Sequence, residues 1–488
     1  MSTHDPLAVL HYAVRARVLG KHLGELLLVV AALTVVPAVV ALYRGEPSVA
    51  WRMVLVIAVL AASAIPLARL RTSTVVQANE ALLVVALAYL LTSAAMVYPF
   101  MAAGVGTLDA WFESVSAVTT TGLSTLPSAE RLPSSLLFAR AWMQWYGGLG
   151  IVVLSVALLS GHGVSARRLV GTAAAENLVT TTRVYARRMV AVYSVLSLLG
   201  VVLLIAFGLS PFDAVSHALA AVSTGGFSTH GESLAAFDSW GARGAVLLVS
   251  TLGAVSLPLY YAAYRGEWRK LVRDEELRAF LMAGVLVCMM LHVLEHGLTI
   301  PSVERLGHAL AMGISAQTTT GFSTMPVTEL SAAGKLVLLL AMAAGGSIGS
   351  TAGGVKWLRL VLLGHLLRLT LRRVAMPAHA VAELRLGGQR VESEEVGRAT
   401  LVVLLFLATV VLSWIPFLAL GYDAVDALLE VVSATGTVGL SAGLSAPGLT
   451  PALKALLSID MLLGRLEFIA LLIVFYPPTW IGRRSAAI

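Results

Sequence analysis

Four short segments rich in threonine and glycine carry the clearest chemical signal in the chain, and they recur at intervals of roughly 100 residues. A single segment of this kind would be an ordinary turn. All four lie between apolar runs and align on the glycine that precedes Leu or Phe. The segments are Thr119–Thr125, Ser223–Thr229, Thr318–Thr324 and Thr435–Ser441, and the aligned glycines are Gly122, Gly226, Gly321 and Gly439. Their recurrence predicts four copies of one structural unit.

Glycine at these positions points to chemistry done by the backbone. Without a side chain, the backbone can take extended or left-handed conformations that aim carbonyl groups at a shared space. A ring of carbonyl oxygens replaces the hydration shell of a monovalent cation, usually potassium. A divalent ion would instead want clustered carboxylates. The predicted ion-binding residues are Thr120, Thr121, Gly122 and Leu123; Thr224, Gly225, Gly226 and Phe227; Thr319, Thr320, Gly321 and Phe322; and Thr437, Val438, Gly439 and Leu440.

The fourth segment departs from the other three because it lacks their Thr-Thr-Gly or Thr-Gly-Gly run. Its register is therefore open, with Gly436 as the alternative to Gly439. For the set as a whole, the alternative to a cation filter is four packed loops that conduct nothing.

The composition places these segments in a membrane protein. Of the 488 residues 58% are hydrophobic and only 12% are charged, whereas soluble domains average about 25% charged residues. The apolar runs are long enough for about ten helical spans. They fall at 23–43, 50–70, 80–103, 135–160, 186–208, 244–264, 279–298, 334–373, 399–421 and 451–477.

A segment too short to span the membrane precedes each Thr/Gly segment. These segments begin near Asp109, Asp213, Glu304 and Asp423, and we expect the aspartates to act as helix N-caps. Non-helical backbone is tolerated at membrane depth only where it is buried in protein or lines a water-filled cavity. The half-helices would run inward, so that their partly negative C-terminal ends face a cation.

The predicted fold class is therefore an all-α polytopic membrane protein with four fused span–pore-helix–filter-loop–span repeats around one pore. We divide the chain into an N-terminal two-helix domain at 1–75 and pore repeats at 76–165, 166–270, 271–375 and 376–488. The third repeat has a broken inner helix.

Basic residues predict the orientation. With the N-terminus inside, only eight of the 34 Lys and Arg residues fall on the outer side, as the positive-inside rule requires. Both termini are thus predicted to be cytoplasmic in a multi-pass protein of the cytoplasmic (inner) membrane. Basic cytoplasmic loops also account for the net charge of +7 without a nucleic-acid partner. The single cysteine, Cys288, excludes an internal disulfide framework.

The chain resembles the Trk/Ktr/HKT superfamily of potassium transporters over about residues 80–480. Besides the four loops, the resemblance rests on the motifs at 142–150 (WMQWYGGLG), 345–356 (GGSIGSTAGGVK) and 463–467 (LGRLE). The two extra N-terminal helices are similar to the TrkH-like branch rather than the KtrB-like branch. In this superfamily serine at the first filter position tends to accompany sodium permeation, so Gly122 implies potassium.

The resemblance also implies a homodimer and a cytosolic, nucleotide-binding TrkA-like regulatory subunit. No dinucleotide fingerprint occurs here, so such a subunit would be a separate chain.

The run at 334–373 is interrupted by glycine and small residues. A phosphate-binding loop is ruled out because Lys356 is followed by Trp357 rather than Ser or Thr. Close helix packing through small residues remains open. The resemblance implies a mobile intramembrane loop below the filter, and small residues allow several backbone arrangements. The predicted gate residues are Gly345, Gly346, Ser347, Gly349, Ser350, Thr351, Gly353 and Gly354, together with Arg465.

Arg465 lies inside a predicted span, where a permanent charge is costly unless it is paired or hydrated. The resemblance implies an electrostatic barrier in the cation path that also donates to loop carbonyls. The alternative is a structural arginine paired with Glu467 or Asp460.

Several other polar residues are explained without catalysis or metal binding. The His292-Val-Leu-Glu295-His296 run matches a zinc-peptidase pattern, but it lies at the outer end of a span and lacks a third acidic ligand. We expect His217 and His308 in the pore helices to be structural. Glu113 and Glu430 either tune the outer electric field or bond neighbouring helices.

The predicted function is potassium uptake driven by existing gradients, with K⁺ as the transported ion, no cofactor and no enzymatic activity in this chain. A membrane potential that is negative inside draws a cation inward by about 2.3 kcal/mol per 100 mV. Channel-like and ion-coupled (symport) transport both remain open. The alternatives are a sodium-permeable transporter of the same fold and, more remotely, an intramembrane zinc peptidase.

Overall fold

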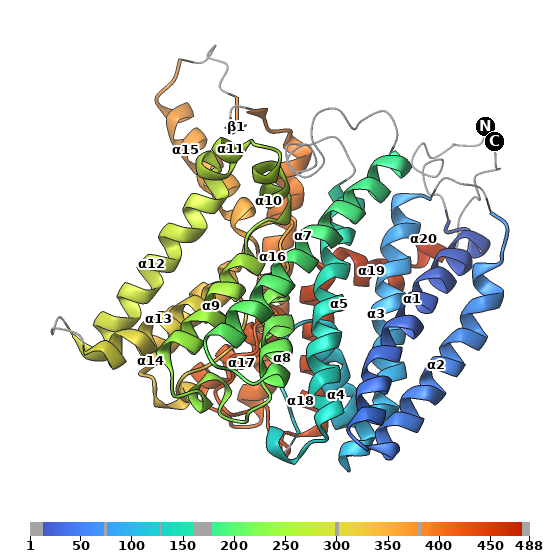
Figure 1. The fold of residues 1–488 in the computed structure, drawn as a ribbon. Helices are drawn as coiled ribbons and strands as arrows, with labels where there is room; N and C mark the ends of the chain where they lie inside the picture. The colour runs from blue at the N-terminus through green and yellow to red at the C-terminus, as the bar shows by residue number, and fades with distance from the viewer. Residues whose placement is uncertain are drawn as a thin grey trace, which may run out of the picture.

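The computed structural model describes residues 13–72, 76–126, 128–159, 178–297, 302–377, 383–387 and 389–480, and these residues are mostly helical (Figure 1). Both termini, predicted to be cytoplasmic, lie outside them. An N-terminal hairpin of two long helices stands at one side of the molecule and α12 at the other. The hairpin consists of α1 (Ala16–Tyr43) and α2 (Pro47–Ala68), and packs against α3 and α5.

After this hairpin the order long helix, short helix, loop, inner helix occurs four times. The elements of the first unit are α3 (Ala78–Phe100), α4 (Thr107–Val118) and α5 (Ser134–Leu159). Those of the second are α7 (Leu178–Ala206), α8 (Pro211–Val222), α9 (Trp240–Ala254), α10 (Leu257–Tyr264) and α11 (Trp268–Arg273). The boundaries of the predicted repeats stay a prediction, and the one at 270 falls inside α11.

The third and fourth units follow the same order. The third contains α12 (Glu275–His296), α13 (Val303–Gln317), α14 (Ala332–Ala344) and α15 (Trp357–Val374). The fourth contains α16 (Ser393–Ala419), α17 (Ala424–Thr435), α18 (Pro451–Arg465), α19 (Ile469–Phe475) and α20 (Pro477–Trp480). A small antiparallel hairpin of β1 (Arg385–Leu386) and β2 (Gln389–Arg390) joins α15 to α16. Short 3₁₀ turns occur at Met101–Ala103, Ala129–Arg131, Ser233–Ala236 and Val327–Glu329.

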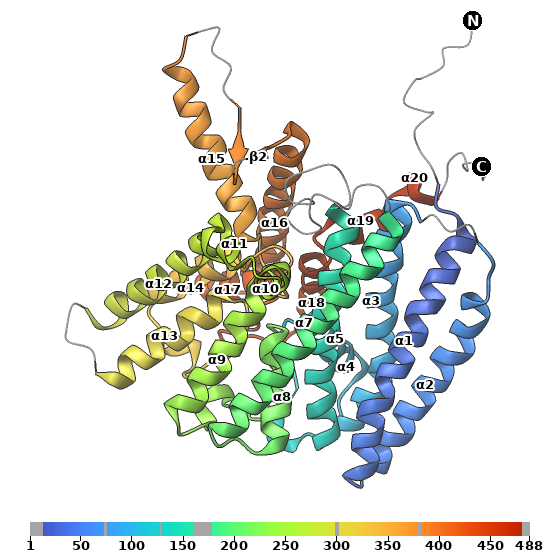
Figure 2. The ribbon, with the colours of Figure 1, turned by 45° about the horizontal axis from the view of Figure 1, so that its top comes forward.

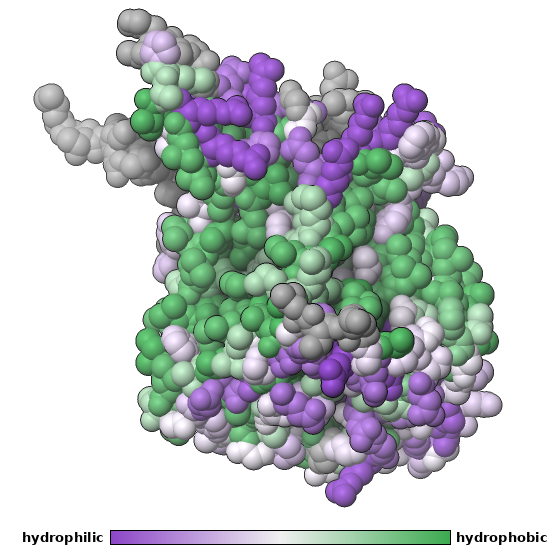
Figure 3. Space-filling model, turned by 90° about the vertical axis from the view of Figure 1, so that its left-hand side faces the viewer, coloured by the Kyte–Doolittle hydropathy of each residue, from purple (hydrophilic) through white to green (hydrophobic). Residues whose placement is uncertain are grey.

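The apolar helices form the membrane-crossing body of the protein. Within the described residues six helices are individually long and apolar enough to cross a membrane, and the bent pair α9–α10 raises the number to seven. All ten predicted apolar runs fall on helices, but the count of ten spans stays a prediction. A continuous hydrophobic band crosses the face that carries α12, with hydrophilic residues gathered above and below it (Figure 3). The chain is a helical polytopic membrane protein.

The short helices α4, α8, α13 and α17 lie among the long ones in the lower half of Figure 1. Only one of them begins as predicted: Asp423 is the N-cap of α17 and accepts from the amides of Val425 and Asp426. The N-caps of α8 and α13 are Ser210 and Ser302, and α4 begins after Gly106. The prediction that Asp109 and Asp213 are caps was therefore wrong. Both lie in the first turn, where their carboxylates reach the filter loops instead.

Three of the four inner helices are broken near the same level, whereas the sequence predicted one break. The predicted break separates α14 from α15 over 345–356. In addition, α9 and α10 meet at 88°, and Pro258 in the first turn of α10 helps to end the preceding helix. Between α18 and α19, Glu467 and Phe468 have φ angles of 51° and 61°. The inner helix of the first unit, α5, continues unbroken. Figure 2 shows α15 and α16 projecting together beyond the other helices.

Candidate functional site

The four loops that follow the short helices share one backbone conformation. Thr120, Thr224, Thr319 and Thr437 all have φ between 49° and 56°, and the glycine two residues later has φ between 74° and 99° in each loop. Positive φ is rare for a β-branched residue and marks stored backbone strain. Gly436 has the helical φ of −78° and ends α17, in the place that Thr119 takes after α4. The backbone thus aligns Gly439, rather than Gly436, with Gly122, Gly226 and Gly321.

The four aligned glycines close a ring. A Cβ added to each would lie closer than 3.0 Å to a backbone carbonyl oxygen of the next loop. In ring order the pairs are Gly122 with Gly225, Gly226 with Thr320, Gly321 with Val438 and Gly439 with Thr121. All four glycines also line a single cavity of about 290 Å³. The structure therefore brings the predicted loop residues from four distant parts of the chain to one place.

Threonine hydroxyls lie at the start of each loop, on the helix side of the glycine ring. The hydroxyls of Thr120 and Thr437 are buried and have no hydrogen-bond partner among the described residues. The Thr224 hydroxyl donates to the carbonyl of Ser223 over 2.7 Å. Buried carbonyl and hydroxyl oxygens are ligands that suit a dehydrated monovalent cation.

Side chains tie each loop to the short helix that precedes it. Ser124 donates to Glu113 over 2.8 Å, and Ser441 donates to Glu430 over 2.9 Å. In the second loop, Ser228 shares a hydrogen bond of 3.0 Å with His217. These three pairs share a separation of 11 residues, which the sequence already contains.

A second set of ties has a separation of 16 residues. Thr125 donates to Asp109 over 2.7 Å and Thr229 donates to Asp213 over 2.6 Å. His308 and Thr324 share a hydrogen bond of 3.0 Å. Glu113 and Glu430 were predicted either to tune the outer electric field or to bond neighbouring helices, and none of these ties to the loops was predicted. The equal spacing was the signal that could have revealed them.

The cavity beside the four glycines is also shaped by α5. The guanidinium of Arg140 forms an ion pair of 2.8 Å with Glu113 and lies 3.8 Å from the centre of the Phe227 ring. Gln144 donates to the carbonyl of Gly225 over 2.5 Å and accepts from the amide of Phe227 over 3.3 Å. Gln144, in the WMQWYGGLG motif, thus holds the backbone of the second loop by two hydrogen bonds.

One carboxylate at the rim of this cavity has a strongly shifted pKa. Glu130 accepts from the Ser128 hydroxyl and, over 2.6 Å, from the amide of Gly231. These hydrogen bonds lower the pKa of Glu130 to about 2. The carboxylate therefore stays ionised at ordinary pH and joins the segments that follow the first and second loops.

The 345–356 segment packs against the helix ends that carry the filter loops. The amide of Gly353 donates to the Thr319 hydroxyl over 2.7 Å, and the amide of Gly354 donates to the carbonyl of Gly436 over 3.0 Å. The Thr351 hydroxyl donates to the carbonyl of Val222 over 2.9 Å. One segment thus contacts the ends of α8, α13 and α17.

Arg465 holds this segment from the fourth inner helix. Its side chain is buried and donates to the carbonyl of Thr351 over 2.8 Å and to that of Gly147 over 3.0 Å. Its hydrogen bonds go to these carbonyls rather than to Glu467 or Asp460. Glu467 pairs with Arg359 over 2.5 Å, and Asp460 accepts from Ser413 over 2.8 Å.

A carboxylate that the sequence analysis did not single out fixes both ends of the segment. One oxygen of Glu276, in the first turn of α12, accepts from the amide of Ile348 over 2.6 Å and from that of Leu358 over 3.0 Å. The buried Lys356 ammonium donates to the carbonyl of Ala352. Acidic residues are common in the first turn of any helix, so no local pattern distinguishes Glu276 from other acidic residues.

The zinc-peptidase pattern is not assembled as a metal site. Glu295 accepts from the amide and the hydroxyl of Ser331, and the rings of His292 and His296 lie 5.5 Å apart between their centres. In the part of the chain that the structure describes, no group of three His, Cys, Asp or Glu residues is placed to hold a metal ion.

Comparison with known proteins agrees with this geometry. The TrkH family model, described as cation transport protein, matches residues 50–479. The Trk system potassium uptake protein TrkH of Vibrio parahaemolyticus is 31% identical over 425 residues, which cover 83% of this chain and 86% of that protein. The protein of the same name from Escherichia coli K12 is 28% identical, with coverages of 95% and 99%. The crystal structure of the potassium transporter TrkH from Vibrio parahaemolyticus superposes with a TM-score of 0.85 and 28% identity, over 96% of this chain and 100% of that one.

Proposed function

The chain belongs to the TrkH family of cation transport proteins, and we propose that it takes up potassium across the cytoplasmic membrane through the ring of four loops. The ring itself carries this proposal, because four loops with one shared backbone turn place their glycines around a single cavity. The names of the relatives as potassium uptake proteins support the choice of ion. The membrane potential then supplies the driving force.

Potassium is favoured over sodium because the ring leaves no room for side chains. A Cβ at any of the four glycines would overlap a neighbouring carbonyl. The ring can therefore present backbone oxygens from all four loops, as a potassium filter requires. A serine at position 122 would add a side-chain hydroxyl to one loop, so that the four loops would no longer be alike. Serine at this position is the feature linked to sodium permeation in the superfamily.

The 345–354 segment and Arg465 form the proposed gate. The segment contacts the helix ends below three of the four loops, so it is placed to block a path through the ring. A permanently charged guanidinium beside it repels a cation, and its two carbonyl partners hold the segment in place. Opening would require these bonds to be exchanged for others.

Further parts of the proposal concern organisation and partners. We assign the four repeats as above, with both termini in the cytoplasm, and a homodimer that carries a cytosolic nucleotide-binding TrkA-like subunit. The words "Trk system" in the names of the relatives support a multi-subunit assembly. Basic residues on α11 and at the end of α15 offer a docking surface on the predicted cytoplasmic side.

The test is growth of a potassium-uptake-deficient bacterial strain at low potassium, combined with ion flux in proteoliposomes. Wild-type protein should rescue growth and carry more K⁺ than Na⁺. Gly122→Ser should abolish rescue or raise the share of Na⁺. Gly104→Ser is the matched control, since Gly104 also has a positive φ, of 77°, but an added Cβ there meets nothing within 4 Å. Sodium flux without rescue by the wild-type protein would overturn the choice of ion.

A further inference from the structure

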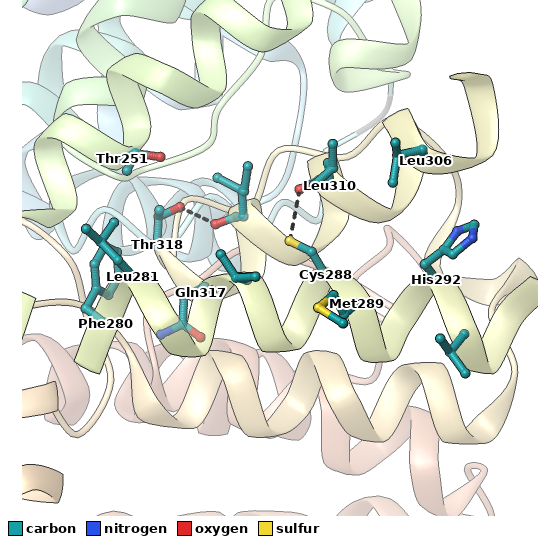
Figure 4. A pocket seen from close by; sticks show the side chains of 14 residues that line it. Thr251, Phe280, Leu281, Cys288, Met289, His292, Leu306, Leu310, Gln317 and Thr318 are labelled. Atoms are coloured by element: carbon teal, nitrogen blue, oxygen red, sulfur yellow. Dashed lines mark hydrogen bonds between the residues drawn. The ribbon is translucent and has the colours of Figure 1, made fainter. Parts of the chain in front are cut away.

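A groove between α12 and α13 is not used by the proposed transport path (Figure 4). Its volume is about 400 Å³. One wall carries Leu281, Val285 and Met289 of α12, and the other carries Leu306, Leu310 and Ile314 of α13. Its lining is almost wholly apolar, so the groove suits a hydrocarbon rather than an ion or a polar metabolite.

The groove opens toward the bilayer. Only 17% of the most apolar stretch of α12 is buried within the protein, and the Val285 and Met289 side chains are 62% and 61% exposed. This is the face that carries the hydrophobic band in Figure 3. In a membrane-spanning helix such an opening meets lipid chains, because no water is present at that depth.

The size of the groove selects one occupant. The lining residues of α12 run from Phe280 to Val293, a rise of about 20 Å at 1.5 Å per residue. A volume of about 400 Å³ over that length gives a cross-section of about 20 Å², or about 5 Å across. A helix is about 10–12 Å wide with its side chains, so a second copy of a span cannot enter. A single extended acyl chain fits both dimensions.

His292 marks one end of the groove. It lines the cavity, and both of its ring nitrogens are buried without a hydrogen-bond partner among the described residues. It lies one turn, about 6 Å, before the end of α12 at His296, so it is close to one end of this apolar span. A neutral imidazole carries one N–H donor, which suits an ester or phosphate oxygen.

We propose that this groove binds one acyl chain of a phospholipid from the leaflet at the His296 end of α12, with His292 donating to the ester or phosphate group of that lipid. The bound chain packs against Gln317, the last residue of α13, and Thr318, the first residue of the third loop. Gln317 in turn donates to the carbonyl of Gly345 over 3.2 Å, at the start of the 345–356 segment. The lipid therefore contacts the joint between the two parts of the transport path. His292, one of the two histidines that resemble a zinc motif, thus acquires a role without a metal.

The test uses purified protein in nanodiscs that contain phosphatidylethanolamine with a photoactivatable diazirine in one acyl chain. After illumination, peptide mapping should find the label on the groove faces of α12 and α13. Gly284→Leu should reduce this labelling at least fivefold, because the new side chain fills the groove. An added Cβ at Gly284 meets only Gln317 Cγ at 3.8 Å, an ordinary contact, so the variant should fold. Gly244→Leu on α9 is the matched control, since an added Cβ there meets nothing within 4 Å, and it should label like the wild type.

Two variants of His292 complete the test. His292→Ala should retain about threefold less lipid in native mass spectrometry, while its melting temperature stays unchanged. His292→Gln should restore lipid retention.

Three outcomes would overturn the proposal. Label spread equally over Val285 and the outward-facing Leu286 would mean annular lipid only. Unchanged labelling of Gly284→Leu would mean that the groove is empty. Cross-links from the groove to a second copy of the chain would mean a protein interface. Because all readouts measure lipid, they do not depend on which ion is transported.

Discussion

The filter loops and the 345–356 segment are both buried and rich in glycine, but they are held in opposite ways. Each filter loop is tied by side chains to the helix that directly precedes it, 11 or 16 residues back. The 345–356 segment is tied mainly to elements that do not adjoin it in the chain: the ends of α8, α13 and α17, Glu276 of α12 and Arg465 of α18. A loop fastened to its own helix keeps its shape when neighbours move. A segment fastened to its neighbours can be released by their movement, which is what separates a filter from a gate.

The largest effect on potassium uptake is expected from Gly226→Ala, which changes one of the four glycines of the ring. The new Cβ would overlap the carbonyl of Thr320, and a positive φ costs a non-glycine residue about 1–2 kcal/mol. We expect potassium uptake in proteoliposomes to fall below about one tenth of the wild-type rate. Gly208→Ala is the control, because Gly208 has a φ of 92° and open space around it. Equal loss of uptake in both variants would show that strain alone, and not the ring, is responsible.

Much of this ring could be predicted from the sequence, because its signal is repetition. The order of helix, loop and glycine is local, so aligning four segments fixes which residues are equivalent. The closure of the ring was not predictable, since it depends on backbone contacts between loops about 100 residues or more apart. The breaks in the second and fourth inner helices were missed for a similar reason. Each break is short and falls within a single apolar run, where Gly253 and Gly464 pack closely against the carbonyls of Val222 and Thr435.

Arg465→Ala tests how the 345–356 segment is held. Its removal leaves the carbonyls of Thr351 and Gly147 without their donor and takes a positive charge out of the proposed path. We expect the basal K⁺ flux to rise about tenfold, the change given by about 1.4 kcal/mol of barrier, with the K⁺-to-Na⁺ ratio unchanged. Arg465→Lys keeps the charge but cannot bridge both carbonyls, so its flux should be intermediate. An unchanged flux at normal expression would reject the barrier.

Glu276 offers a milder way to loosen the same segment. Hydrogen bonds to a charged group contribute about 1.5–3 kcal/mol each, and one oxygen of Glu276 accepts two of them. Glu276→Ala should raise basal flux about fivefold and lower the melting temperature. Glu276→Gln keeps an acceptor oxygen in the same place, so its flux should change by less than about twofold. If both variants behaved alike, the carboxylate would act through its charge and not by holding the two ends of the segment.

The smallest effect is expected from Thr125→Val, which removes one tie of the first filter loop without changing its shape. The hydrogen bond to Asp109 is lost, but Asp109 keeps its ion pair with Lys454, so the cost should be only about 1 kcal/mol. The fourth loop already lacks this tie: it has Ala442 at the equivalent position, and Asp426 pairs with Lys335 over 2.6 Å. We therefore expect normal uptake, a slightly lower melting temperature and a small fall in the K⁺-to-Na⁺ flux ratio. Thr125→Ser keeps the hydroxyl and should match the wild type. A large loss of selectivity in Thr125→Val alone would mean that this single tie, rather than the set of ties in each loop, holds the filter.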